Sequence, residues 1–234
     1  MVERYSLSSL DEVAGLFGAG AELVPRFNIA PLQRAPIRTA AGLALARWGL
    51  LPPWRGHGGK RGPHVLHAPL DALEALDATP LLRNAFTRQR CLVLADGFFV
   101  WRRAGKKPQP MWLHPLPDPA RPLARSRLIA LAGVAATNKD DHAPSFALVV
   151  GPANPLVAAG LAPGAAAGPI APRVVPAESF ALWLDGPRDQ ALALLTLAER
   201  GWRADPVSTW VNSVDHDDAR CVEPLGNPAQ GQLF

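Results

Sequence analysis

Short apolar runs separated by glycine, proline and polar residues recur along the whole chain. Their lengths and their branched and aromatic side chains are typical of β-strands. The runs that predict strands are 44–50, 91–95, 98–101, 128–134, 145–150 and 207–214. Asp96-Gly97 stands between the second and third of these runs, and this pair favours a hairpin turn.

Other segments repeat their apolar residues at the spacing of an α-helix. These segments are 70–78, 81–89, 179–184 and 189–200. Ser9 and Glu12 have the spacing of a capping box, which predicts a short helix that ends near Gly18. Strands and helices mixed in this irregular order predict an α+β fold rather than a regular βαβ array.

Neither an internal repeat nor a linker is evident. We therefore expect one domain over residues 1–225, followed by a frayed tail over residues 226–234.

Composition narrows the class of protein. Hydrophobic residues make up 48% and charged residues 19% of the 234 positions, which is typical of a globular chain. No apolar run has the length of a membrane span, and the first residues lack an export signal. The two cysteines exclude a disulfide scaffold. We expect a cytoplasmic protein.

Basic charge is concentrated in the first half of the chain. Residues 1–110 contain 15 Lys/Arg and 8 Asp/Glu, whereas residues 111–234 contain 9 and 12. A basic half favours an anionic partner such as nucleic acid. The abundance of Ala, Pro, Gly and Arg is also typical of a GC-rich genome, and composition alone favours this second interpretation.

The usual chemical motifs are absent. The chain has no phosphate-binding loop, dinucleotide fingerprint or nucleophile-elbow serine. His57, His64 and His67 match no zinc spacing, and the acidic run 215–218 is more typical of a polar turn. We predict neither a metal nor a cofactor.

Tryptophans in the basic half are more informative. Trp54 is followed by Arg55 and by a glycine-rich basic loop over residues 55–64. An indole beside guanidinium groups suits single-stranded nucleic acid, because bases stack on aromatic rings while phosphates pair with arginine. Trp48 and Trp101 are expected in the core, and exposure and burial are equally compatible with the position of Trp54.

Several motifs, taken in order, resemble the SRAP family of SOS-response-associated peptidase-like, or abasic-site processing, proteins. The most specific is Ala95-Asp96-Gly97-Phe98-Phe99-Val100-Trp101. The other matching segments are 26–31, 48–54, 90–94, 107–110, 130–133, 152–154, 172–176, 211–214 and 223–224. The resemblance runs nearly end to end and implies a single SRAP-type domain, with an irregular, mainly antiparallel and partly barrel-like sheet surrounded by helices.

The resemblance also implies a chemistry. In the family, an N-terminal cysteine joins the aldehyde of an abasic site in single-stranded DNA through a thiazolidine, and an asparagine, a glutamate and a histidine assist. Those four positions fall on Val2, His67, Val100 and Ala171, and a pocket threonine falls on Val150. Most replacements are hydrocarbons, which transfer no protons. We therefore expect a pseudoenzyme that has lost the stable DNA–protein crosslink and keeps only the α-amine of Val2.

The positions that hold DNA in the family are better retained. By resemblance they are Arg4, Asn28, Pro31, Trp54, Arg55 and Arg173. We expect the partner to be single-stranded or abasic-site DNA. The alternative is a non-catalytic interaction module for a protein partner or intact single-stranded DNA. Arg4 and Arg173 are equally compatible with ion pairs that hold the fold.

A peptidase or another hydrolase has the least support. The remaining residues offer no Ser/His/Asp or Cys/His arrangement, and Cys91 lies in an apolar strand where we expect it to be buried and inert.

Overall fold

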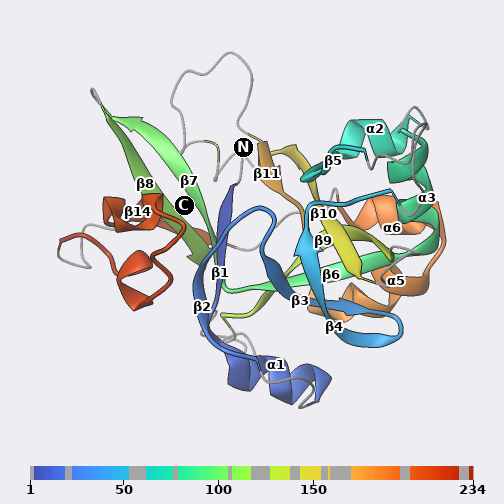
Figure 1. The fold of residues 1–234 in the computed structure, drawn as a ribbon, viewed down its shortest axis with the longest axis horizontal. Helices are drawn as coiled ribbons and strands as arrows, with labels where there is room; N and C mark the ends of the chain where they lie inside the picture. The colour runs from blue at the N-terminus through green and yellow to red at the C-terminus, as the bar shows by residue number, and fades with distance from the viewer. Residues whose placement is uncertain are drawn as a thin grey trace.

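The computed structural model describes residues 3–18, 23–52, 62–75, 79–104, 107–116, 127–137, 143–153, 158, 170–195, 201–226 and 232–233. Helices and strands are mixed within these ranges, and the strands form two sheets (Figure 1). The predicted α+β fold with a mainly antiparallel and partly barrel-like sheet is confirmed.

The first sheet closes into a small barrel. Its strands are β3 (Arg34–Thr39), β4 (Gly42–Trp48), β6 (Arg90–Ala95), β9 (Ile129–Thr137) and β10 (Pro144–Pro152). They follow the order β10-β4-β3-β6-β9, and β9 pairs again with β10. All six residues of β6 are buried, because helices cover the outer face of this strand.

Three short strands extend the barrel. They are β5 (His67–Pro69), β11 (Ile170–Pro172) and β12 (Val174–Val175). The first two pair with the last residues of β10, and β12 pairs with β9. The end of β10 therefore has a short strand on each side.

The second sheet is antiparallel throughout. Its strands are β1 (Arg4–Leu7), β2 (Arg26–Ile29), β7 (Gly97–Ala104), β8 (Lys107–Pro115), β13 (Trp202–Pro206) and β14 (Gln232–Leu233). The order is β14-β13-β8-β7-β1-β2. Gln232 and Leu233 lie in the tail that we expect to be frayed, but they form a strand that pairs with Arg203 and Ala204 of β13.

The chain passes from one sheet to the other at Asp96-Gly97. Strand β6 pairs with β3 and β9, whereas β7 pairs with β1 and β8, so the expected hairpin turn is wrong. The Asp96 carboxylate fixes the crossing, because it accepts hydrogen bonds from the hydroxyls of Ser6 and Ser8. Gly97 is needed for close approach: a Cβ there would lie 2.7 Å from the Leu113 carbonyl oxygen.

Four of the helices in the described ranges cover the outside of the barrel, on the right of Figure 1. They are α2 (Leu70–Glu74), α3 (Pro80–Arg88), α5 (Phe180–Asp185) and α6 (Arg188–Leu194). A 3₁₀ turn, η3 (Ala177–Ser179), leads into α5. The predicted helices are confirmed where they are described, and residues 76–78 and 196–200 lie outside the described ranges.

Helix α1 (Leu10–Phe17) is present as predicted, but its capping box is not. The Ser9 side chain makes no capping hydrogen bond. The Glu12 carboxylate instead accepts the backbone N–H groups of Arg127 and Leu128, each at 3.1 Å. Glu12 therefore joins α1 to the beginning of β9.

Residues 207–226, here called the C-terminal arm, lack the strand that the apolar pattern predicts over 207–214. The arm contains η4 (Thr209–Asn212) and η5 (Ala219–Cys221) instead. The Ser208 hydroxyl accepts the Trp210 N–H and so starts η4. Val211 and Cys221 pack against Phe99 of the second sheet, where they form a smaller core.

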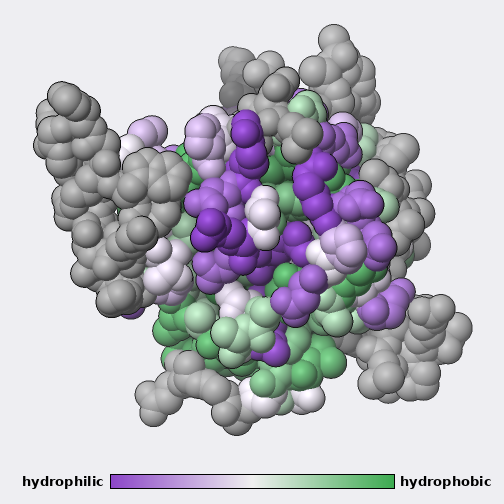
Figure 2. All heavy atoms as spheres, turned by 90° about the vertical axis from the view of Figure 1, so that its right-hand side faces the viewer, coloured by the Kyte–Doolittle hydropathy of each residue, from purple (hydrophilic) through white to green (hydrophobic). Residues whose placement is uncertain are grey.

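The outer helical face is hydrophilic. Exposed charged residues of both signs lie on these helices, including Asp71, Glu74, Arg83, Arg88 and Asp189. Seen from that side, hydrophilic residues fill the centre of the surface (Figure 2). None of the described helices has the length and apolar character to cross a membrane.

Candidate functional site

A pocket opens beside the first residue of β1. It has a volume of about 300 Å³ and is lined by Glu3, Arg4, Trp101, Pro108 and Asn212. The Trp101 Nε1–H donates to Asn212 Oδ1 at 2.8 Å. The pocket therefore combines three strands of the second sheet with the C-terminal arm.

Arg4 is the basic residue of this pocket. Its Nη1 donates to the Glu3 carbonyl oxygen at 2.8 Å, while its buried Nε has no partner within the described chain. Burial lowers the pKa of Arg4, and the nearby Glu3 carboxylate acts in the opposite direction. A buried donor without a partner is costly. As a cation that lines the pocket, Arg4 would bind an anion favourably.

Val100 lies on the opposite face of the same sheet. Because side chains alternate along β7, Phe98 and Val100 face the core shared with the barrel, whereas Phe99 and Trp101 face the C-terminal arm. Val100 is 6% exposed. The position that the resemblance assigns to the family glutamate is thus a packed hydrocarbon.

Strands β5 and β11 bring three further predicted positions to the end of β10. Val150 pairs with Pro69 on one side and with Pro172 on the other. Since residues opposite each other share a face, His67 and Val150 lie on one face, while Ala171 lies on the other together with Gly151. The structure therefore places these positions close in the sheet without gathering them on one face.

Among the positions that the resemblance assigns to catalysis at this end of the sheet, His67 has a titratable side chain. It is half-buried, and its ring meets Trp48 edge-on with the centroids 6.2 Å apart. Trp48 itself is fully buried, which confirms its predicted place in the core.

Arg173 is directed toward backbone carbonyls. Its Nη1 donates to the Pro152 carbonyl at 3.0 Å, and its Nη2 donates to the Leu195 carbonyl. Leu195 ends α6, where the helix dipole favours a cation. Arg173 therefore joins the barrel to α6.

Asn28 is fully buried, and its amide holds the C-terminal arm. The Nδ2 group lies 3.1 Å from the Val211 carbonyl, 2.8 Å from that of Ser213 and 2.7 Å from that of His216. Its two hydrogens are shared among these three acceptors. The N–H donors of the Asn28 amide are thus satisfied by carbonyls of the protein.

Pro31 precedes Leu32, a residue with a positive φ. The Gln33 N–H donates to the Ala30 carbonyl at 3.2 Å, and Leu32 between them has φ 70°. Proline followed by a positive φ defines a type II turn, which favours glycine at the position of Leu32. Pro31 is half-buried at this turn.

The remaining predicted site residues, Val2, Trp54 and Arg55, lie outside the described residues, as does most of the basic loop. Sequence reasoning did not identify Trp101 and Asn212 as walls of the Arg4 pocket. Both belong to motif segments, but only the fold brings residues 111 positions apart into hydrogen-bonding contact.

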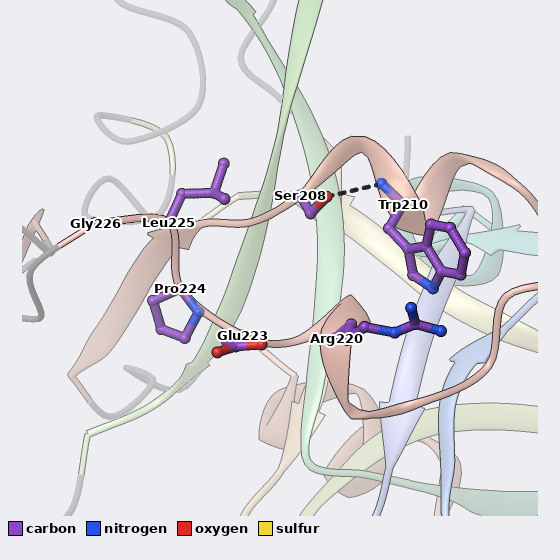
Figure 3. A pocket seen from close by; sticks show the side chains of 7 residues that line it. All are labelled: Ser208, Trp210, Arg220, Glu223, Pro224, Leu225 and Gly226. Atoms are coloured by element: carbon purple, nitrogen blue, oxygen red, sulfur yellow. Dashed lines mark hydrogen bonds between the residues drawn. The ribbon is translucent and has the colours of Figure 1, made fainter.

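A second cavity of about 320 Å³ lies on the C-terminal arm (Figure 3). It is lined by Ser208, Trp210, Arg220, Glu223, Pro224, Leu225 and Gly226. The Arg220 guanidinium lies 4.1 Å from the centre of the Trp210 ring and pairs with Asp218. Hydrogen bonds from Arg220 lower the pKa of Asp218. None of the predicted site residues lines this cavity.

Residues of the acidic run 215–218 make contacts that hold the C-terminal arm in place. Asp217 accepts the backbone N–H groups of Phe27 and Asn28, and it pairs with Arg26. The His216 ring stacks on Trp210, with centroids 3.3 Å apart. Within the described ranges, no three His, Cys, Asp or Glu side chains form a group that could hold a metal ion.

Both cysteines are buried and unpaired. Burial raises the pKa of the Cys91 thiol well above its usual range and also raises that of Cys221. The expected burial of Cys91 is confirmed, and a protonated thiol in the core is a poor nucleophile.

The chain is similar in sequence to proteins named as abasic site processing proteins. The chain is 30% identical over 145 residues to abasic site processing protein YoaM of Bacillus subtilis, which covers 57% of this chain and 59% of YoaM. It is 26% identical over 105 residues to abasic site processing protein HMCES of Xenopus tropicalis, covering 38% and 30% of the two chains. These matches span less than two thirds of each relative.

Solved structures extend the similarity of the fold to nearly the whole chain. A protein from Bacteroides thetaiotaomicron superposes with a TM-score of 0.73 at 19% identity, covering 95% of this chain and 99% of that one. A phage-related protein from Bordetella bronchiseptica gives a TM-score of 0.62 at 25% identity, covering 88% and 93%. The family model described as SOS response associated peptidase (SRAP) matches residues 1–214. The chain therefore belongs to the SRAP family.

Proposed function

We propose that this protein binds single-stranded or abasic-site DNA and no longer forms the stable crosslink that the family chemistry implies. Membership of the SRAP family and similarity to abasic site processing proteins support the DNA partner. The observation that carries the loss of chemistry is Val100, a buried hydrocarbon where the family has a glutamate.

Two further positions support this loss. Val150 and Ala171 are 4% exposed each, so neither the threonine nor the histidine of the family has a polar substitute there. Hydrocarbon side chains neither donate nor accept the protons that closing and opening a thiazolidine require. His67 is then the remaining group that can exchange a proton.

Binding is proposed to begin at Arg4. Arg4 is the basic residue that lines the pocket, so its guanidinium suits a phosphate oxygen through a charge-assisted hydrogen bond. Trp101 and Asn212 complete the walls of that pocket. A phosphate is positioned there without any need for covalent chemistry.

A weaker covalent route remains open to the amine. If Met1 is removed, the α-amine of Val2 can condense with the aldehyde of an abasic site, which gives an imine and releases water. The usual pKa of such an amine, roughly 7.7–8.0, leaves a reactive fraction at neutral pH. The imine is hydrolysed readily, whereas borohydride reduces it to a stable secondary amine.

Gel analysis of abasic single-stranded DNA, incubated with and without borohydride, tests this proposal. We expect an adduct only with borohydride, and none when the N-terminus is acetylated. DNA whose abasic aldehyde has been reduced beforehand is the matched control. A heat-stable adduct formed without reductant would contradict the loss of crosslinking.

The second candidate is a non-catalytic module for intact single-stranded DNA or a protein. Its support is that Asn28 and Arg173, both retained from the family pattern, satisfy backbone carbonyls and so maintain the fold. This candidate predicts no trapped adduct, but salt-dependent DNA binding that weakens on Arg4→Ala or Trp54→Ala. A chain that binds no DNA would favour a protein partner.

The two unpaired cysteines suit a reducing compartment. We place this activity in the cytoplasm, and fractionation of cells that express the protein tests that assignment.

A further inference from the structure

One segment of the chain carries basic charge without any acid. Residues 23–70 contain seven Lys/Arg and no Asp or Glu. Within the described part of this segment, Arg26 is neutralised by Asp217 of the C-terminal arm. Arg34 and Arg47 are exposed and make no ion pair with the described residues.

These two arginines stand directly opposite each other. Arg34 on β3 pairs with Arg47 on β4. The Trp48 N–H donates to the Gln33 carbonyl, which makes Arg34–Arg47 a non-hydrogen-bonded pair with Cα atoms about 4.5 Å apart. Like charges at this spacing repel and destabilise a sheet. An anionic ligand would remove that repulsion.

An exposed apolar side chain lies beside the pair. Leu32 is 45% exposed and has φ 70°, a conformation that is unfavourable for leucine. The Arg47 Nη1 donates to the Leu32 carbonyl at 3.2 Å, and the Leu32 N–H donates to the Trp48 carbonyl at 2.7 Å. The turn that presents Leu32 is thus tied to the arginine pair.

We propose that Leu32, Arg34 and Arg47 form a contact surface for one nucleic-acid strand. The two guanidinium groups bind phosphates of the strand, and Leu32 packs against a base. The phosphates supply the negative charge that balances the two arginines, and a base supplies an apolar face for Leu32. An inorganic anion offers no such apolar face. This inference rests on the proposed DNA-binding function and names a surface separate from the Arg4 pocket.

Binding of fluorescein-labelled intact single-stranded DNA to the full chain tests the arginines by anisotropy over a range of salt concentrations. We expect Arg34→Gln with Arg47→Gln to weaken binding about tenfold at low salt. The slope of log affinity against log salt should fall by about 0.7 for each phosphate that the protein no longer neutralises. The matched control is Arg83→Gln with Arg88→Gln on α3, which removes the same charge from the outer helical face.

Thermal unfolding separates binding from folding. Removing a like-charge pair should leave the Tm of the Arg34→Gln, Arg47→Gln protein unchanged or higher, whereas a stabilising role of these arginines in the fold would make the Tm fall. Equal affinity and equal salt slope in this variant and the control would overturn the inference while the proposed function stands. Failure of the unaltered protein to bind DNA would overturn both.

Leu32 has its own test. An oligonucleotide with 2-aminopurine brightens when that base is unstacked, and we expect such a signal with the unaltered protein. Leu32→Gly should abolish it without lowering Tm, because glycine adopts a positive φ freely. Leu16→Ala, on an exposed leucine of α1, is the control. An undiminished signal from Leu32→Gly would overturn the base contact.

Discussion

Asn28 shows how a single buried amide organises the second sheet and the C-terminal arm. The residue lies on β2, yet its three acceptors lie more than 180 positions later in the chain. Since the arm also carries Asn212 to the Arg4 pocket, Asn28 affects that pocket without lining it.

Asn28→Asp replaces the donor by an acceptor of the same shape. We expect the free energy of unfolding to fall by about 2–3 kcal/mol, because three carbonyls would then face a carboxylate without a donor. Urea denaturation measures the change. The same substitution at Asn84 on α3 should change stability by less than about 0.5 kcal/mol. Equal effects at the two positions would contradict the assigned role.

Gly97 is a second residue whose identity determines the packing around it, because it allows close approach of β8. A Cβ at this position meets the Leu113 carbonyl at 2.7 Å and presses on the Trp112 indole. We expect Gly97→Ala to cost about 1–3 kcal/mol, because the backbone of β8 must shift.

Gly15 on α1 provides the matched control for Gly97. An added Cβ there meets nothing within 4 Å, so Gly15→Ala should stabilise the protein by about 0.5–1 kcal/mol. Thermal unfolding of both variants measures the contrast. Similar changes in Tm would exclude close approach as the reason for Gly97.

At the scale of elements, Arg90 joins the ends of two helices. It is 7% exposed, and its guanidinium donates to the carbonyls of Phe86, Trp183 and Gly186. Burial lowers the pKa of Arg90, and the carboxylate of Asp185 acts in the opposite direction. The ends of α3 and α5 thus share one cation, which the helix dipoles favour.

Arg90→Lys keeps the charge but loses the planar fork that reaches several carbonyls at once. We expect a loss of about 1.5–3 kcal/mol in chemical denaturation. Arg88→Lys, two residues earlier and exposed, should be close to neutral. If Arg90→Lys left the free energy of unfolding unchanged, water would be satisfying these carbonyls instead.

Local pattern predicts elements well where burial follows periodicity. Strands β4, β6, β9 and β10 and the helices on the barrel are all indicated by spacing. The pattern fails over 207–214, because Val207 and Val211 pack against the second sheet from a segment that forms a 3₁₀ turn instead of a strand. It also fails at Asp96-Gly97, where distant serines rather than the dipeptide set the path.

The site is less predictable than the fold. The resemblance locates Arg4 and Val100, but sequence cannot show that they face opposite sides of one sheet. Likewise, the number of basic residues indicates a basic half, but it does not show which arginines make contacts within the protein. Arg26 pairs with Asp217, Arg90 donates to the Trp183 carbonyl, and Arg173 donates to the Leu195 carbonyl. These contacts are formed only in the tertiary structure.

At the scale of the whole molecule, two hydrophobic cores lie on opposite faces of the second sheet. Cys91 belongs to the larger core, which the barrel shares, and Cys221 belongs to the smaller core under the C-terminal arm. Each core therefore contains one buried thiol that reports on its own opening.

We expect iodoacetamide at pH 8 to label neither thiol rapidly in the folded protein, because burial raises both pKa values and excludes the reagent. Cys221 should be labelled first through local opening of the arm, and Cys91 only at the rate of global unfolding. Mass spectrometry of the labelled peptides measures both rates. Simultaneous labelling would show that the two cores open as one unit.

The hydrogen bond between Trp101 and Asn212 has a consequence for how ligands can be detected. Asn212 lines the Arg4 pocket and Cys221 lies nine positions later on the same arm, so a ligand that requires the closed arm must suppress its opening. By thermodynamic linkage the open population falls by the factor 1 + [L]/Kd. The dependence of the Cys221 labelling rate on ligand concentration then gives a binding isotherm, so occupancy of the pocket can be titrated without measuring a reaction.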